Sequence, residues 1–326
     1  MNPDESAPPR AQDSASNTSP EQIGHGRRPP KRGLVLRIFL NQRELRSGWR
    51  LLVFVMLWAG LLFFLLALAR GLIHLGPGAK HTRQLLLGEG LMLVAALIAA
   101  GILALAERRS FADYALPWRQ AFGAKFWLGL VWGGLALTAV LLLIYYYHGF
   151  SFGPLATAGK KRLLLEAAVW AAGFFVVALY EEFFFRGYAL YTLASGVGFW
   201  PASALLSIAF GAVHLRNPGE NWVGALAAGL IGLFCCFTVR RTGALWFAIG
   251  FHAMWDYAES FIFFVPDSGT TIARHLFSSA LYGPAWLTGG AVGPEASIFV
   301  FVVIANLFIL VHLLYPKARF AVVKAT

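Results

Sequence analysis

Charged side chains are scarce in this sequence: Asp, Glu, Lys and Arg make up 13% of its 326 residues, whereas a soluble domain has about 25%. Hydrophobic residues make up 58%, and the mean hydropathy is +0.63. This composition excludes an ordinary soluble domain and indicates an integral membrane protein in contact with membrane lipid. The net charge of +11 does not indicate a nucleic-acid partner, because a basic nucleic-acid-binding domain would not be this apolar.

Cysteine is almost absent as well. The two cysteines, Cys235 and Cys236, are adjacent in one apolar run, and neighbours on a helix point to different faces, which makes them poor disulfide partners. The sequence therefore has no disulfide framework and no Cys-based metal site. Both residues are expected to pack within a helix.

Apolar segments are missing from the first 33 residues, which are rich in Pro, Ser and Asp. This stretch lacks the apolar centre of a cleavable signal peptide, and its composition is typical of a disordered chain. We predict a disordered cytoplasmic tail over residues 1–33, followed by a helical membrane domain over residues 34–326.

Long apolar runs fill the remainder of the chain. A spanning helix needs about 20 mostly apolar residues, and about eight segments come near this requirement. The predicted fold is therefore an all-α, polytopic transmembrane helix bundle. The predicted spans are Trp49–Leu75, Leu85–Ala106, Phe126–Tyr147, Leu163–Ala194, Ala202–His214, Trp222–Val239, Ala244–Phe264 and Ser297–Tyr315.

Basic residues between these runs predict the orientation of the bundle. With eight spans, the basic N-terminal flank, the connections containing Arg108 and Arg240, and the tail containing Lys317 all fall on one side. The positive-inside rule makes this side cytoplasmic, so both termini are predicted to be cytoplasmic. Five basic residues fall on the other side and oppose this orientation: Lys80, Arg83, Lys160, Lys161 and Arg162.

The connection between the last two spans, residues 265–296, contains L-T-G-G-A-V-G-P-E-A-S. Gly289, Gly290, Gly293 and Pro294 disfavour a regular helix. Such a segment can fold back toward a site or run along the surface. The sequence favours a plain surface loop.

Two carboxylates and a guanidinium interrupt the fourth run: Glu181, Glu182 and Arg186 lie in A-L-Y-E-E-F-F-F-R-G-Y-A-L. Each ionised group at mid-bilayer costs roughly 2.5–3.5 kcal/mol, so it needs a partner or a function. Glu182 and Arg186 are four residues apart and are expected to pair as structural support. Glu181 points about 100° away and gains no such neighbour on its own helix.

Further polar residues, His214, His252 and Asp256, lie in the fifth and seventh runs. His252 and Asp256 are four residues apart and share a helix face. Counted from the expected cytoplasmic helix ends at about 1.5 Å per residue, Glu182, His214 and His252 lie about 18, 21 and 14 Å deep. These similar depths predict a shared polar pocket.

Three other polar residues in the spans have plainer interpretations. Glu89 and Glu166 lie near helix ends and are expected to extend toward the membrane interface. His312 is expected to be a hydrogen-bonded packing residue.

Carboxylate and imidazole groups in a dry pocket indicate a specific chemistry. A carboxylate beside an imidazole can deprotonate a water molecule, and a second histidine with a polar neighbour can stabilise an oxyanion, which together suit amide hydrolysis. If Glu181 and His214 act in direct contact, a carboxylate oxygen should lie within about 4 Å of a ring nitrogen. The same residue types can bind a divalent metal such as zinc, which is the alternative. The sequence contains no H-E-x-x-H, G-x-S-G or G-x-G-D motif.

Three motifs, on the fourth, fifth and seventh spans, carry a family resemblance: E-E-F-F-F-R (181–186), F-G-A-V-H (210–214) and H-A-M-W-D (252–256). They resemble the E-E-x-x-x-R, F-x-x-x-H and H-x-x-x-N/D motifs of the CAAX prenyl protease and bacteriocin-processing (CPBP, Abi) family of intramembrane proteases. The resemblance implies a family core at about residues 163–264 and an intramembrane glutamic endopeptidase of a bacterial inner membrane. It implies a membrane-associated protein or peptide substrate, with CAAX-type processing as one such activity.

By position, the resemblance implies that Glu181 and His214 activate the hydrolytic water and that His252 and Asp256 stabilise the oxyanion, without a cofactor. One position departs from the family pattern, because the prenyl-protein proteases have Asn where this chain has Asp256. A carboxyl group donates a hydrogen bond only when it is protonated. Orientation of His252, or metal binding, is therefore the alternative role for Asp256.

Two other functions are compatible with these polar residues. A non-catalytic membrane scaffold or immunity protein would keep the pocket for structure or partner binding. An ion or proton pathway would use the residues as a relay, but it would need polar side chains continuing to both faces, and the fourth to seventh spans offer few. The combination of four catalytic-type residues favours the enzyme.

Overall fold

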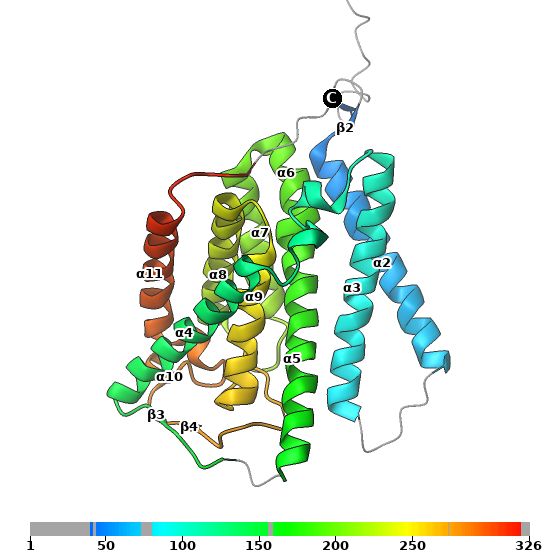
Figure 1. Ribbon diagram of the computed structural model, residues 1–326. Helices are drawn as coiled ribbons and strands as arrows, with labels where there is room; N and C mark the ends of the chain where they lie inside the picture. The colour runs from blue at the N-terminus through cyan, green and yellow to red at the C-terminus, as the bar shows by residue number, and fades with distance from the viewer. Residues whose placement is uncertain (1–39, 42–43, 73–79, 156–158, 273, 321–326) are drawn as a thin grey trace, which may run out of the picture. The chain divides into compact units, whose positions relative to one another are not determined.

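The computed structural model describes residues 40–41, 44–72, 80–155, 159–272 and 274–320. The predicted disordered tail, residues 1–33, lies outside these residues. A helix occupies each of the eight predicted spans (Figure 1), so the all-α fold is confirmed. The helices are α2 (Ser47–Leu72), α3 (Lys80–Ala106), α4 (Ala124–Tyr146), α5 (Lys160–Glu182), α6 (Leu190–Val197), α7 (Phe199–His214), α8 (Trp222–Thr242), α9 (Trp246–Asp256) and α11 (Ile298–Leu314).

Two π-helical segments extend this set. The segment η3 (Phe183–Ala189) joins α5 to α6 without a break, and η4 (Tyr257–Ile262) continues α9. The fourth predicted span, Leu163–Ala194, thus lies within one continuous helix of 38 residues, residues 160–197. The π-helical segments begin directly after Glu182 and Asp256, which is a frequent position for such segments beside functional residues.

Short elements complete the described chain. The strands β1 (Leu40–Asn41) and β2 (Glu44–Leu45) form one antiparallel pair, and β3 (Phe150–Ser151) and β4 (Ala280–Leu281) form another. The remaining short helices are η1 (Phe111–Tyr114), η2 (Trp118–Gln120), α10 (Ala285–Thr288) and η5 (Pro294–Ala296).

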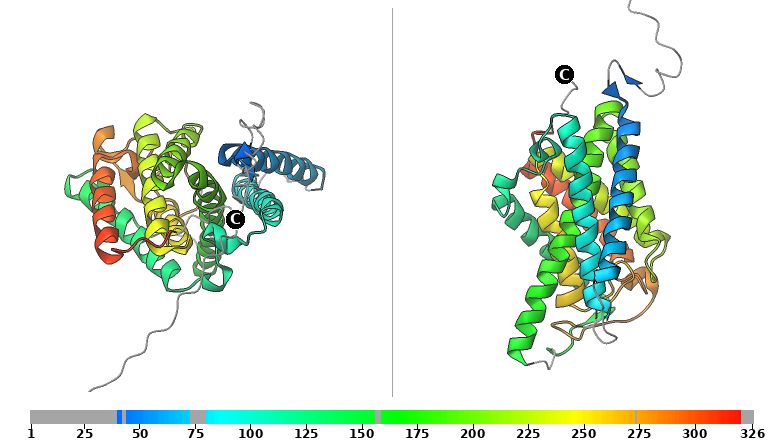
Figure 2. Two further views of the ribbon diagram at one scale, coloured as in Figure 1. Left: turned by 90° about the horizontal axis from the view of Figure 1, so that it is seen from above. Right: turned by 90° about the vertical axis from the view of Figure 1, so that its right-hand side faces the viewer.

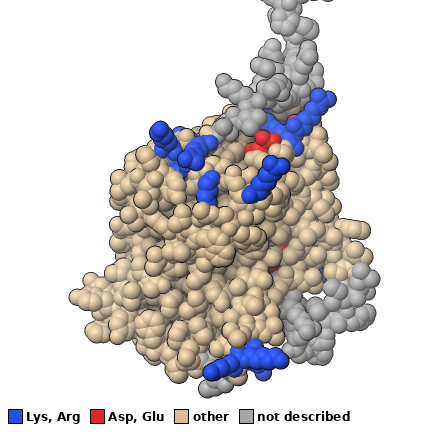
Figure 3. Space-filling model, viewed as in Figure 1, with Lys and Arg blue, Asp and Glu red and all other residues tan. Residues whose placement is uncertain are grey.

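Helix length and composition support insertion in a membrane. Five described segments are long and apolar enough to cross a bilayer: residues 47–70, 86–106, 124–146, 160–197 and 222–242. The apolar helices α7 and α11 are shorter, with 16 and 17 residues. Figure 3 shows the side of the molecule that faces the viewer in Figure 1. On this side, Lys and Arg gather toward two opposite ends, and the surface between them is largely uncharged. The chain is therefore an integral membrane protein.

The long helix α5 lies between the α2–α3 pair and the remaining helices (Figures 1 and 2), and both α3 and α9 pack against it. The side of α9 that faces away from α5 packs closely on α4. A Cβ atom added at Gly129 or Gly133 of α4 would overlap the carbonyl oxygens of Phe247 and Phe251. Small residues four apart let two helix backbones approach in this way, and the approach fixes the part of α9 that carries His252.

Contacts at one end of the bundle join the segments whose basic residues predicted a common side. Arg50 of α2 forms an ion pair with Glu107, which follows α3. The backbone N–H of Leu245 donates to the carbonyl of Ala115 at 2.8 Å. The N–H of Arg319 donates to the carbonyl of Arg240, also at 2.8 Å. These segments are therefore neighbours in space.

The prediction of a plain surface loop over residues 265–296 is wrong. Val265, Val292 and Glu295 are buried, and the N–H of Gly269 donates to the carbonyl of Val292 at 2.9 Å. The Asn217 side chain, which follows α7, donates to the carbonyl of Ser268 at 3.0 Å. Tertiary contacts thus fold this connection back onto the ends of α7 and α9, an outcome that its glycine content alone does not indicate.

Candidate active site

The buried ion pair of the fourth predicted span lies at the end of α5. Arg186 Nη1 is 3.1 Å from Glu182 Oε1, and each side chain is 1% exposed. The Arg186 guanidinium also lies over the Phe210 ring of α7, 4.0 Å from its centroid. A cation in this position is attracted to the face of the ring, so Arg186 joins the helix of Glu182 to α7.

His252 of α9 is surrounded by three carboxylates. Its Nδ1 lies 2.9 Å from Glu182 Oε1, while its Nε2 lies 3.3 Å from Asp256 Oδ2 and 3.7 Å from Glu181 Oε2. Glu182, as the partner of Arg186, is an ionised group that can only accept hydrogen bonds. His252 must therefore carry a proton on Nδ1, and its Nε2 faces Glu181 and Asp256.

His214 lies at the last position of α7, and its ring is held by its own helix. Its Nδ1 is 2.8 Å from the carbonyl oxygen of Phe210, so Nδ1–H donates to this carbonyl. In the neutral ring the proton on Nδ1 leaves Nε2 as an acceptor. The Phe210 ring also contacts the imidazole, with centroids 4.6 Å apart. Phe210 thus fixes both the tautomer and the orientation of His214, a role that the sequence did not assign to it.

No direct hydrogen bond or ion pair joins Glu181 to His214 among the residues that the structure describes. The imidazole nearest to the Glu181 carboxylate is instead that of His252, so the expected direct contact is not present. Both side chains nevertheless line one cavity of about 200 Å³, together with Glu182, His252 and Asp256. A cavity of this size and polarity holds water molecules, and a water molecule can bridge groups that are too far apart for direct contact.

Three acidic residues of this cavity were not assigned to it from the sequence, and the prediction that Glu89 extends toward the membrane interface is wrong. Glu89 of α3 lines it, because α3 packs against α5, and its Oε2 is buried without a hydrogen-bond partner in the described chain. Asp267 and Glu295 line it from the folded-back connection. The one available signal was an acidic residue, Glu295, within a stretch of Gly, Ala and Pro.

The other polar residues of the spans lie elsewhere. Glu166 pairs with Arg162 at 3.1 Å and with Arg274 at 3.4 Å near the start of α5. His312 of α11 contacts Arg241, with 2.7 Å between Nδ1 and Nη2. Neither residue lines the cavity.

The fit of a metal ion depends on how closely the ligand atoms converge. In the described part of the chain, one set of three acidic or imidazole side chains has ligand atoms all within 4.8 Å of one another: Glu259, Asp267 and Glu295. The residues proposed for a zinc site from sequence, Glu181, His214, His252 and Asp256, do not form such a set. Two of their four ring nitrogens are already engaged, by Phe210 and Glu182.

One comparison with known proteins gives a match. Residues 163–258 match the family model described as type II CAAX prenyl endopeptidase Rce1-like. No curated protein and no solved structure matches the chain. The matched region holds all three motifs, and the match supports an enzyme of the CAAX protease type acting on a membrane-embedded protein or peptide. Residues 163–258 are therefore similar to the Rce1-like family, which confirms the resemblance to CAAX proteases that the three motifs indicated.

Proposed function

We propose that the protein is an intramembrane endopeptidase that hydrolyses a peptide bond with a water molecule activated by Glu181 and His214. The observation that carries this proposal is one cavity lined by Glu181, His214, His252 and Asp256. These side chains come from three helices, and a bundle without a reaction to perform gains little from the cost of inserting them.

The chemistry follows from the available atoms. A water molecule between a Glu181 oxygen and His214 Nε2 gives a proton to Glu181 while its oxygen bonds to the carbonyl carbon of the substrate. The electron pair of the carbonyl double bond moves to the carbonyl oxygen as an oxyanion. When this intermediate collapses, the C–N bond breaks and the proton passes from Glu181 to the leaving nitrogen.

Stabilisation of the oxyanion requires a proton on the side of the cavity formed by His252 and Asp256. Because Nδ1–H of His252 is donated to Glu182, Nε2 donates only if the ring is an imidazolium. Alternatively, a protonated Asp256 donates. One proton, carried by His252 Nε2 or by Asp256 and directed into the cavity, therefore supplies one donor to the oxyanion; His252 Nε2 and Asp256 Oδ2 lie 3.3 Å apart.

The proposal extends to substrate and location. The substrate class is a membrane-associated protein or peptide, with prenylated carboxyl termini as the first candidates because of the family match. No cofactor is required, and zinc at the same cavity is the alternative. The location is a bacterial inner membrane, with the end of the bundle that holds Arg50 and Arg240 in the cytoplasm.

The test is cleavage of labelled membrane peptides, prenylated and unprenylated, by the purified full-length protein. Glu181→Gln should abolish cleavage without changing the thermal unfolding midpoint. Glu166→Gln, which changes a carboxylate outside the cavity, is the matched control and should remain active. Equal cleavage by the wild type and Glu181→Gln would refute the assignment, and no cleavage by the wild type would favour a scaffold.

A further inference from the structure

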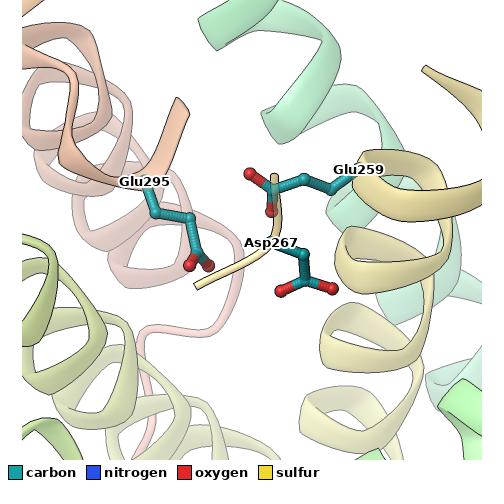
Figure 4. A group of neighbouring side chains, drawn as sticks. All are labelled: Glu259, Asp267 and Glu295. Atoms are coloured by element: carbon teal, nitrogen blue, oxygen red, sulfur yellow. The ribbon is translucent and has the colours of Figure 1, made fainter. Parts of the chain in front are cut away.

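Three carboxylates from separate segments converge beside the cavity. Glu259 comes from η4, Asp267 from the connection after it, and Glu295 from η5, and their oxygens lie within 4.8 Å of one another (Figure 4). Segments that are up to 36 positions apart in the sequence, by the difference between 295 and 259, thus bring three acidic groups together. Such a convergence is unfavourable unless something positive lies between the carboxylates.

Glu259 points to a ligand by its own environment. Its side chain is 0% exposed, and neither carboxylate oxygen has a hydrogen-bond partner among the described residues. The nearby indole N–H of Trp255 donates to Glu295 Oε1 instead, at 3.0 Å. Figure 4 shows the Glu259 carboxylate directed toward the space beside the other two. A buried carboxylate without a donor is costly, and binding of a cation removes that cost.

The other two carboxylates are oriented but retain free lone pairs. Glu295 Oε2 accepts from the N–H and the hydroxyl of Ser268, at 3.0 and 2.5 Å, whereas Oε1 accepts only from Trp255. Asp267 accepts from the Ser260 hydroxyl through Oδ2, at 2.9 Å. Each carboxylate oxygen has two lone pairs. Both groups can therefore bind an ion without giving up these hydrogen bonds.

Positive side chains do not supply the missing charge. Within the described residues, no Lys or Arg forms an ion pair with any of the three carboxylates. The group therefore needs a cation or bound protons.

We propose that Glu259, Asp267 and Glu295 bind a hard divalent cation of the Ca²⁺, Mg²⁺ or Mn²⁺ class, at a site distinct from the peptide-cleaving residues. A donor set made only of oxygen atoms favours these ions over zinc. Two oxygens bound to one cation at about 2.4 Å lie at most about 4.8 Å apart, so oxygens that all lie within 4.8 Å of one another can share one ion. Asp267 and Glu295 also line the cavity, which supplies an entry path and room for water ligands.

The bound ion would fasten the connection of residues 265–296 to η4 and so shape one wall of the cavity. The test uses the full-length protein in detergent after removal of metals with a chelator. Mn²⁺ alone is added, and its binding is followed by electron paramagnetic resonance. Wild-type protein should bind one Mn²⁺ per chain, with displacement by Ca²⁺ or Mg²⁺, a raised unfolding midpoint, and a change in tryptophan fluorescence from Trp255.

Matched variants locate the ion. Glu259→Gln should weaken Mn²⁺ binding at least about tenfold, since it replaces one ligand, and Glu181→Gln should leave binding unchanged. If Glu259→Gln does not fold, the wild type and Glu181→Gln still decide the question. Loss of binding in Glu181→Gln would place the ion in the peptide-cleaving site and overturn the proposal. Absence of saturable Mn²⁺ binding by the wild type would also overturn it, and would indicate carboxyl groups that share protons.

Discussion

Glu182 of α5 holds the imidazole of His252 on α9, with 2.9 Å between Oε1 and Nδ1. The same Oε1 atom is 3.1 Å from Arg186 Nη1. The Glu182 carboxylate therefore bridges Arg186 and His252, and this pair of interactions links the E-E-x-x-x-R motif to the H-x-x-x-D motif. The second glutamate of the pair is a positioning residue for a ring on another helix, as well as the partner of an arginine on its own.

Removal of Arg186 should cost more stability than removal of a surface arginine. Arg186→Ala leaves the Glu182 carboxylate buried without its cation, and breaking a buried pair in this way costs about 3–5 kcal/mol. Arg162→Ala breaks a pair in which the arginine side chain is 59% exposed, and should cost at most about 1 kcal/mol. Folded yield and the unfolding midpoint in detergent measure the difference. A normal yield of Arg186→Ala would argue against this supporting role.

Asp256 offers a test of the oxyanion donor. Asp256→Asn keeps the shape of the side chain and supplies a permanent N–H donor, so it should retain cleavage, whereas Asp256→Ala should lose roughly 10²–10³-fold in kcat. Initial rates of peptide cleavage by the wild type and the two variants provide the measurement. An inactive Asp256→Asn would instead indicate that a carboxylate at this position orients His252.

The close approach of α4 and α9 predicts an effect far from the reacting atoms. A Cβ at Gly133 would overlap the carbonyl oxygen of Phe251, next to His252. Gly133→Ala should therefore force the helices apart and cost about 1–3 kcal/mol. Gly134→Ala is the control, since its Cβ would meet only the flexible Met254 side chain, at 3.2 Å. Unfolding midpoints and cleavage rates are measured for both, and equal values would contradict this account of the packing.

Removal of metal ions tests whether cleavage needs zinc in the cavity, as distinct from the proposed divalent-cation site at Glu259, Asp267 and Glu295. If Glu181 and His214 activate the water molecule without a metal ion, as proposed, a zinc-selective chelator such as phenanthroline should leave cleavage unchanged. Initial rates before and after dialysis against the chelator provide the measurement. A loss of cleavage that Zn²⁺ restores and Mn²⁺ does not would support the zinc alternative.

Local patterns explain what could be predicted from the sequence. Long apolar runs predict spanning helices, and spacing of four residues predicts neighbours such as Glu182 with Arg186 on one helix. The contact between Glu182 and His252 could not be predicted, because it depends on how α5 packs against α9. Glu89 was assigned to the interface since it lies near a helix end, yet the packing of α3 on α5 brings it to the cavity.

The folded-back connection shows the same limit. Its glycines indicated only that a helix would not form. The burial of Glu295 depends on hydrogen bonds donated by Trp255 of α9 and by Ser268, which is 27 positions earlier in the same connection. No periodic pattern records such contacts. The three motifs did indicate residues that line one cavity, because each motif contains a polar side chain that is costly within a membrane.

The most direct test of the central claim is a double-mutant cycle on the two residues proposed to activate the water molecule. Cleavage rates are measured for wild type, Glu181→Gln, His214→Ala and the double variant, with a sensitive mass-spectrometric assay that detects residual hydrolysis. If both residues act on one water molecule, the double variant should be no slower than the slower single variant, because groups that act as a unit are strongly non-additive. Independent losses that multiply in the double variant would contradict the account.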